Sequence, residues 1–151
     1  MKTLILGLGS PILTDDGVAF AVVDELRRQI DSSDVTLHQA SVGGLGLLEL
    51  VVGYDKVIIL DAIQTDGAEP GQIHFLSPDE HHGNLRAAST HDISFATALE
   101  LGRRLREDVP EEIIILAVEA ADVETFGEEF TPAVAAAVPR AVELVLRELA
   151  G

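Results

Sequence analysis

Residues 3–17 read Thr-Leu-Ile-Leu-Gly-Leu-Gly-Ser-Pro-Ile-Leu-Thr-Asp-Asp-Gly. The apolar part of this stretch, residues 4–8, is typical of a buried strand. Apolar side chains then recur at helical spacing over about 16–30, which predicts a helix. A short loop therefore joins the strand to the helix and delivers two adjacent carboxylates, Asp15 and Asp16, to the start of that helix.

Two interpretations of this acidic pair are open. Ligands of open α/β sheets bind at the carboxyl ends of the strands, where carboxylates are suited to holding a cation or to acid–base chemistry. Alternatively, Asp15 or Asp16 only caps the helix, because aspartate is a preferred N-cap residue and favours the first helical turn.

Composition limits the class of protein. The chain has 151 residues, 47% of them hydrophobic and 4% aromatic, and a net charge of −16. This predicts a single domain, 1–151, with an aliphatic core. Such a negative charge argues against nucleic-acid and anionic-membrane partners. Cysteine is absent, which excludes thiolate chemistry and disulfides. Because Met1 leads directly into a strand, with no signal peptide, we expect a cytoplasmic protein.

Strands and helices alternate along the rest of the chain. Such alternation is typical of a three-layer α/β/α domain with a mostly parallel sheet. The apolar run that ends in Asp61 predicts a central parallel strand. Pro139 is expected to kink the last helix or mark a weak point in it. The predicted strands cover about 34–39, 56–60, 72–77 and 112–118, the further helices 45–52, 92–106 and 132 onward, and the longest loops 78–90 and 119–130.

Three side chains form the main candidate site. Asp16 and Asp61 each follow a strand of the predicted parallel sheet, and His91 precedes a predicted helix. Two converging carboxylates repel each other and favour a bound cation. Two oxygens and one imidazole nitrogen suit a borderline divalent ion such as nickel, zinc or manganese. The alternatives are a turn hydrogen bond for Asp61 and a structural role for His91; the pair His81–His82 is a weaker candidate.

Two other enzyme classes fit poorly. A dinucleotide fingerprint needs a third glycine where Ile12 stands, and the acidic pair would repel a pyrophosphate. The segment around Ser41 holds only half of a serine-hydrolase elbow.

Several of these segments together resemble the hydrogenase maturation endopeptidases. The similarity runs in order from residue 4 to about 148. It is carried by 7–17, Gly43-Gly44, Leu60-Asp61-Ala62, Thr90-His91 and Phe130-Thr131-Pro132. Two positions depart from the family pattern: residue 10 is Ser where Asn is usual, and the first-loop acid is Asp where some members have Glu.

The resemblance implies a twisted five-stranded sheet flanked by helices. It also implies a nickel site at Asp16, Asp61 and His91, catalytic roles for Asp16 and Asp61, and a substrate-facing turn at Gly43-Gly44. The nickel would belong to the substrate, the large-subunit precursor of a nickel–iron hydrogenase, whose C-terminal extension the peptidase removes. The nucleophile, a carboxylate or a metal-bound water, stays open. The alternative function is a nickel-sensing assembly chaperone without peptidase activity.

Overall fold

The computed structural model describes residues 1–79 and 93–151, and these form a five-stranded sheet. Its order is β2-β1-β3-β5-β4, in which β4 is antiparallel to β5 and the other neighbours are parallel. The strands are β1 (Thr3–Leu8), β2 (Val35–Ala40), β3 (Lys56–Ile63), β4 (Ile73–Leu76) and β5 (Glu112–Glu119). The mostly parallel sheet with an edge strand near 72–77 is confirmed.

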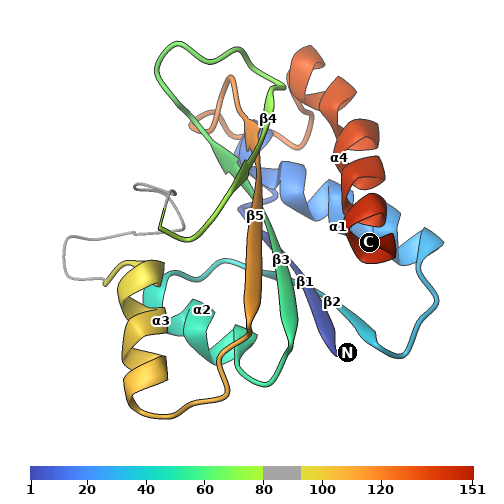
Figure 1. Cartoon of the computed structure of the whole chain (residues 1–151). Coiled ribbons are helices and arrows are strands. Elements are labelled where there is room, and N and C mark those ends of the chain that lie inside the picture. Colours follow the sequence, from blue (N-terminus) through green and yellow to red (C-terminus); the bar gives the residue numbers. More distant parts are fainter. Residues whose placement is uncertain (80–92) are drawn as a thin grey trace.

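Helices cover both faces of this sheet (Figure 1), which confirms the three-layer architecture. The helices α1 and α4 pack on one face, and α2 and α3 on the other. The short 3-10 helix η1 leads from the β1 loop into α1. The bounds are η1 (Thr14–Gly17), α1 (Val18–Gln29), α2 (Gly44–Val51), α3 (Phe95–Arg104) and α4 (Pro132–Ala150).

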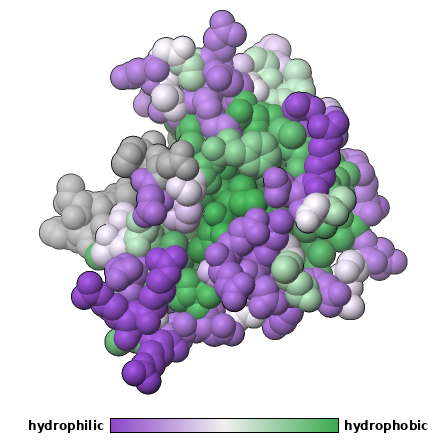
Figure 2. Space-filling model, in the orientation of Figure 1, coloured by the Kyte–Doolittle hydropathy of each residue, from purple (hydrophilic) through white to green (hydrophobic). Residues whose placement is uncertain are grey.

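Alternate residues of each strand enter two separate aliphatic cores. In β3, Ile58 and Leu60 face α1 and α4, whereas Val57 and Ile59 face α2 and α3. This division follows from the two-residue repeat of a strand. In Figure 2, hydrophobic residues gather near the centre of the face shown, and hydrophilic residues dominate its periphery.

The last helix runs without a break through Pro139. Proline removes one backbone N–H and displaces the carbonyl four residues earlier. Both Pro139 and that residue, Ala135, are exposed, so water can satisfy the displaced carbonyl. No helix of the described residues is both long enough and apolar enough to span a membrane.

Candidate active site

The two acids of the first loop have different surroundings. Asp15 is fully buried, and its carboxylate accepts four hydrogen bonds from the segment that links β5 to α4. Oδ2 accepts from the backbone N–H groups of Ala121 (2.8 Å) and Asp122 (2.9 Å) and from the Thr131 hydroxyl (2.8 Å). Oδ1 accepts from the backbone N–H of Thr131 (2.8 Å). Asp15 thus fixes the 120–131 loop to the first loop.

The simpler interpretation of the acidic pair, a helix cap, is wrong. The N-cap residues are Leu13 for η1 and Gly17 for α1, and neither helix has a side-chain cap hydrogen bond. Thr131 is the N-cap of α4, but its hydroxyl donates to Asp15 instead of capping the helix.

Asp16 is held against the end of β1. Its backbone carbonyl accepts a hydrogen bond from the Ser10 N–H (3.2 Å), and a Cβ atom added at Gly9 would lie 2.1 Å from that carbonyl oxygen. Only glycine allows this approach. The glycine at position 9 therefore lets the loop fold back on its strand. The Asp16 side chain is largely buried in this arrangement.

Asp61 lies inside β3, because the strand continues to Ile63 where the sequence predicts that it ends near residue 60. Its side chain is 1% exposed, and Oδ1 accepts a hydrogen bond from the Ala62 N–H (2.9 Å). By strand parity it lies on the same face as Val57 and Ile59, toward α2 and α3.

The sheet register brings the two acids to neighbouring positions. Gly7 pairs with Leu60, which places Leu8 beside Asp61 in the parallel ladder. Gly9, the next residue, touches the backbone of Asp16, and η1 contacts β3. The two buried acids therefore lie at the carboxyl ends of the neighbouring strands β1 and β3, where α/β proteins bind their ligands.

The predicted third ligand, His91, lies outside the described residues, as do His81 and His82. Within residues 1–79 and 93–151, no three His, Cys, Asp or Glu side chains form a group that could hold a metal ion. The described part of the chain thus supplies two carboxylates of the expected ligand set, and that set stays a prediction.

The glycine turn before α2 has a packing role. Gly43 is the N-cap of α2, and Gly44 has a φ of +33°. A Cβ atom added at Gly44 would lie 2.3 Å from the carbonyl oxygen of Ile93, two residues after His91 in the sequence. The turn therefore holds the chain at residue 93 against the start of α2, and its predicted contact with substrate stays a prediction.

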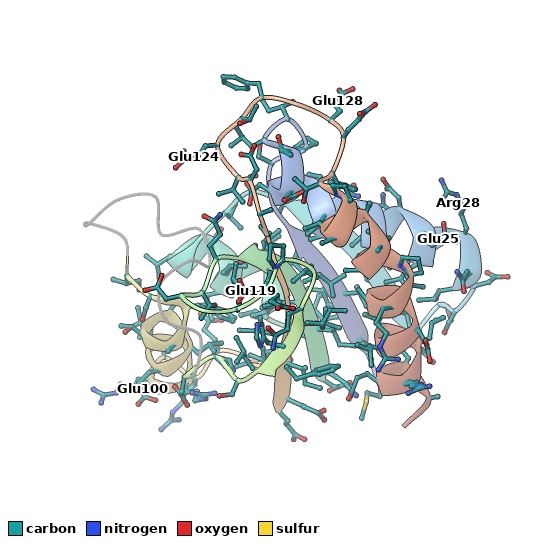
Figure 3. All side chains as sticks on the ribbon, turned by 90° about the horizontal axis from the view of Figure 1, so that it is seen from above. Glu25, Arg28, Glu100, Glu119, Glu124 and Glu128 are labelled. Carbon is teal, nitrogen blue, oxygen red and sulfur yellow. The ribbon has the colours of Figure 1, made fainter. Side chains whose placement is uncertain are left out.

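The sequence assigns Glu119 to an acidic loop, and this is wrong. Glu119 is the last residue of β5 and is 2% exposed. Its Oε1 lies 3.0 Å from Nε2 of His74 in β4, and its Oε2 accepts a hydrogen bond from the Thr65 N–H (3.0 Å). In Figure 3 it lies near the centre of the molecule, whereas Glu124 and Glu128 project from the outer side of the 120–131 loop. No local signal marks this position, because the apolar run of β5 ends at Val118 and Glu119 is the charged residue that follows it.

The rest of the acidic loop is more exposed and internally hydrogen-bonded. Asp122 Oδ1 accepts hydrogen bonds from the backbone N–H groups of Thr125 (2.9 Å) and Glu124 (3.0 Å). These bonds lower the pKa of the Asp122 carboxyl below its ordinary value, and the hydrogen bonds with Thr125 have the largest effect. The Ser41 hydroxyl donates to the Gly9 carbonyl, so this serine ties two loops together.

Comparison with known proteins assigns the chain to a family. The sequence profile described as hydrogenase maturation protease matches residues 20–148. Hydrogenase expression/formation protein HupD of Rhizobium leguminosarum bv. viciae is 28% identical over 98% of this chain and 74% of its own length. Hydrogenase 2 maturation protease of Escherichia coli K12 is 28% identical, over 99% of this chain and 91% of its own.

A solved structure agrees with the sequence matches. The hydrogenase maturating endopeptidase HybD from E. coli superposes with a TM-score of 0.82 at 28% identity, over 99% of this chain and 92% of that one. The fold, the buried carboxylates and these matches define a peptidase of the three-layer α/β class. The chain belongs to the hydrogenase maturation protease family.

Proposed function

We propose that this peptidase removes the C-terminal extension from the large-subunit precursor of a nickel–iron hydrogenase after nickel has been inserted. The family match and the E. coli relative named hydrogenase 2 maturation protease support this proposal. The nickel is part of the substrate, so that only a loaded precursor is cut.

The observation that carries the proposal is the pair of buried carboxylates at the ends of two neighbouring parallel strands. Asp16 is 8% exposed and Asp61 is 1% exposed. Negative charges that are close together and shielded from water repel strongly, and a divalent cation relieves this repulsion. A nickel ion presented by the precursor would supply the positive charge.

His91 completes the proposed ligand set, because imidazole nitrogen is a preferred donor to nickel. The contact between Ile93 and Gly44 supports this assignment: it anchors the residues that follow His91 on the α2 and α3 side of the sheet, toward which Asp61 also faces. We propose that Gly43 and Gly44 lie along the path of the bound precursor. By holding the nickel of the precursor, Asp16 and Asp61 would orient the scissile peptide bond.

The test is to incubate the purified protein with nickel-loaded and nickel-free precursor and to measure the mass of the large subunit. We expect the loss of a C-terminal peptide from the loaded precursor alone. The variants Asp16→Asn, Asp61→Asn and His91→Ala should each abolish cleavage, because each removes a ligand. Asp24→Asn changes an exposed acid on α1 and should cleave at the wild-type rate.

Circular dichroism and thermal melting of each variant show whether the fold is retained. Full cleavage by a folded Asp16→Asn or Asp61→Asn variant would remove that residue from the site. Stable binding of loaded precursor with no change in its mass would instead identify an assembly chaperone.

A further inference from the structure

The buried Glu119 and its half-buried partner His74 play no part in the function proposed above. Glu119 is 2% exposed, and its two carboxylate oxygens accept from different partners: Oε1 from His74 Nε2 and Oε2 from the Thr65 N–H, each at 3.0 Å. Burying a carboxylate is costly unless it is well hydrogen-bonded. The preceding residues of β5, Ala117 and Val118, fill their positions with apolar side chains, so a charged residue here needs a reason beyond packing.

The strand register places this pair beside the proposed site. Asp61 of β3 pairs with Ala117 of β5, and Ala117 pairs with His74 of β4. The three residues thus form one row across three strands. Neighbouring strands are about 4.8 Å apart, so the backbones of Asp61 and His74 are separated by about 10 Å.

Strand parity places both side chains on the same face of the sheet. Asp61 has the parity of Ile59, and His74 that of Leu76, and both Ile59 and Leu76 belong to the core beneath α2 and α3. Ala117 lies between them and carries only a methyl group. Two charged side chains share this face with His74 among the described residues of this row and of the last residues of β5. They are Asp61, in the same row, and Glu119, two residues after Ala117.

The hydrogen bond to Glu119 assigns the state of the imidazole. A carboxylate accepts, so the proton of a neutral His74 resides on Nε2 and the lone pair on Nδ1. No hydrogen bond joins Nδ1 to any of the residues that the structure describes. The His74 side chain is 25% exposed, and the lone pair on Nδ1 is the group of the neutral ring that can accept a proton. A buried carboxylate behind an imidazole also stabilises the imidazolium that forms.

We propose that His74 is an acid–base residue of the cleavage reaction and that Glu119 is its positioning residue. Nδ1 accepts one proton of the attacking water as the water oxygen bonds to the scissile carbonyl carbon. It returns this proton to the leaving nitrogen as the C–N bond breaks. The products are a carboxylic acid, which ionises to solvent, and a free amine. This inference rests on the proposed function, because it needs the scissile bond to lie beside Asp61.

The experiment measures single-turnover cleavage of nickel-loaded precursor between pH 5 and pH 9. His74→Gln keeps a hydrogen-bond donor for Glu119 but cannot titrate. It should lower the rate constant by about 10²- to 10⁴-fold and flatten the pH profile of the rate. Glu119→Gln should also change the pH profile of the rate, since the negative charge beside the imidazole is lost. Binding of the precursor should be unchanged in both variants.

The chain offers a matched control, His38, which lies exposed on the opposite edge strand β2. His38→Gln should leave the rate and its pH profile unaltered. The proposal is overturned if His74→Gln cleaves with the wild-type rate and pH profile, or if it loses activity only through weaker binding or a lower melting temperature.

A second measurement needs no substrate. The ¹⁵N chemical shifts of the neutral His74 ring should show protonated Nε2 and unprotonated Nδ1, and the opposite tautomer would overturn the proposal. The proposed function itself fails separately, if the wild-type protein leaves the loaded precursor uncut.

Discussion

The adjacent residues Asp15 and Asp16 show how neighbours of one chemical type acquire different roles. The donors to Asp15 lie 106, 107 and 116 positions away in the sequence. No local sequence pattern indicates such donors, so the sequence names Asp16 as a ligand candidate but does not predict the structural role of Asp15. The two residues differ because the folded 120–131 loop donates four hydrogen bonds to the Asp15 carboxylate. Asp16 is therefore the acid of this pair that belongs to the proposed site.

Replacing Asp15 with Asn should destabilise the fold without directly removing a proposed ligand. An amide has one acceptor oxygen, so its NH₂ group would face N–H groups that now point at a carboxylate oxygen. Buried donors left unsatisfied predict a loss of about 2–3 kcal/mol in the free energy of unfolding. Urea unfolding measures this loss, with Asp24→Asn as the exposed control. Faster hydrogen exchange at Ala121, Asp122 and Thr131 should accompany it, and unchanged exchange there would contradict the role of Asp15.

Glu119 shows a second limit of the sequence at the scale of single residues. It lies within the longest stretch of the chain without Lys or Arg, residues 107–139, and composition alone favours a solvated loop. The outcome depends on one further step of strand alternation in β5 and on His74, which arrives from an edge strand 45 positions earlier in the sequence. Pairing between strands, not local composition, buries this carboxylate.

At the scale of elements, the order of strands and helices could be predicted well. Aliphatic runs such as that of β3 and the helical spacing in α1 are strong local signals. The errors lie at the ends: β3 continues to Ile63, and η1 precedes α1. Strand ends depend on pairing partners, here the whole length of β5 beside β3, and a single run of sequence does not contain them.

The start of α2 allows backbone strain to be separated from packing. Gly44 (φ +33°) and Gly53 (φ +94°) both have positive φ, but only Gly44 faces a neighbour, the Ile93 carbonyl oxygen 2.3 Å from an added Cβ atom. Gly53→Ala should cost about 1–2 kcal/mol from φ alone. Gly44→Ala should cost about 1–3 kcal/mol more, because the segment at Ile93 must shift. Denaturant midpoints at a constant m-value measure both.

Cleavage assays extend this comparison to function. Since Ile93 follows the proposed ligand His91 by two residues, Gly44→Ala should also slow the cleavage of loaded precursor, whereas Gly53→Ala should not. Equal stability and equal activity of the two variants would show that the contact with Ile93 is unimportant.

At the scale of the whole molecule, charge is distributed unevenly. The loops at the carboxyl edge of the sheet, 9–17, 41–43, 64–72 and 120–131, contain no Lys or Arg. Apart from Lys2 and Arg106, the basic residues of the described chain lie at the start of β3, as Lys56 does, or on helices, as Arg147 does near the end of α4. These loops therefore carry a net negative charge, which favours the approach of cations and basic segments.

The net charge of −16 also predicts how stability depends on salt. Attraction between opposite charges stabilises the fold, and repulsion between like charges destabilises it. The observed ion pairs are mostly exposed, as between Arg147 and Glu143, and exposed pairs contribute little to stability. Repulsion among 26 acidic residues against 10 basic ones should dominate. The Debye length falls from about 30 Å at 0.01 M to about 10 Å at 0.1 M salt. Screening should therefore stabilise the fold by about 1 kcal/mol, or raise the melting temperature by about 2–4 °C.

Calorimetry at pH 7 in 0.01 M and 0.1 M sodium chloride tests this expectation, and urea serves as an uncharged denaturant for the same comparison. Replacing the exposed acids Glu124, Glu128 and Glu129 together with Gln removes three like charges from one loop and should reduce the response to salt. If ion pairs dominated instead, added salt would lower the melting temperature. The sign of the change in melting temperature thus shows which interaction is larger, because salt screens repulsion and attraction alike. In a chain this acidic we expect the repulsion to be larger.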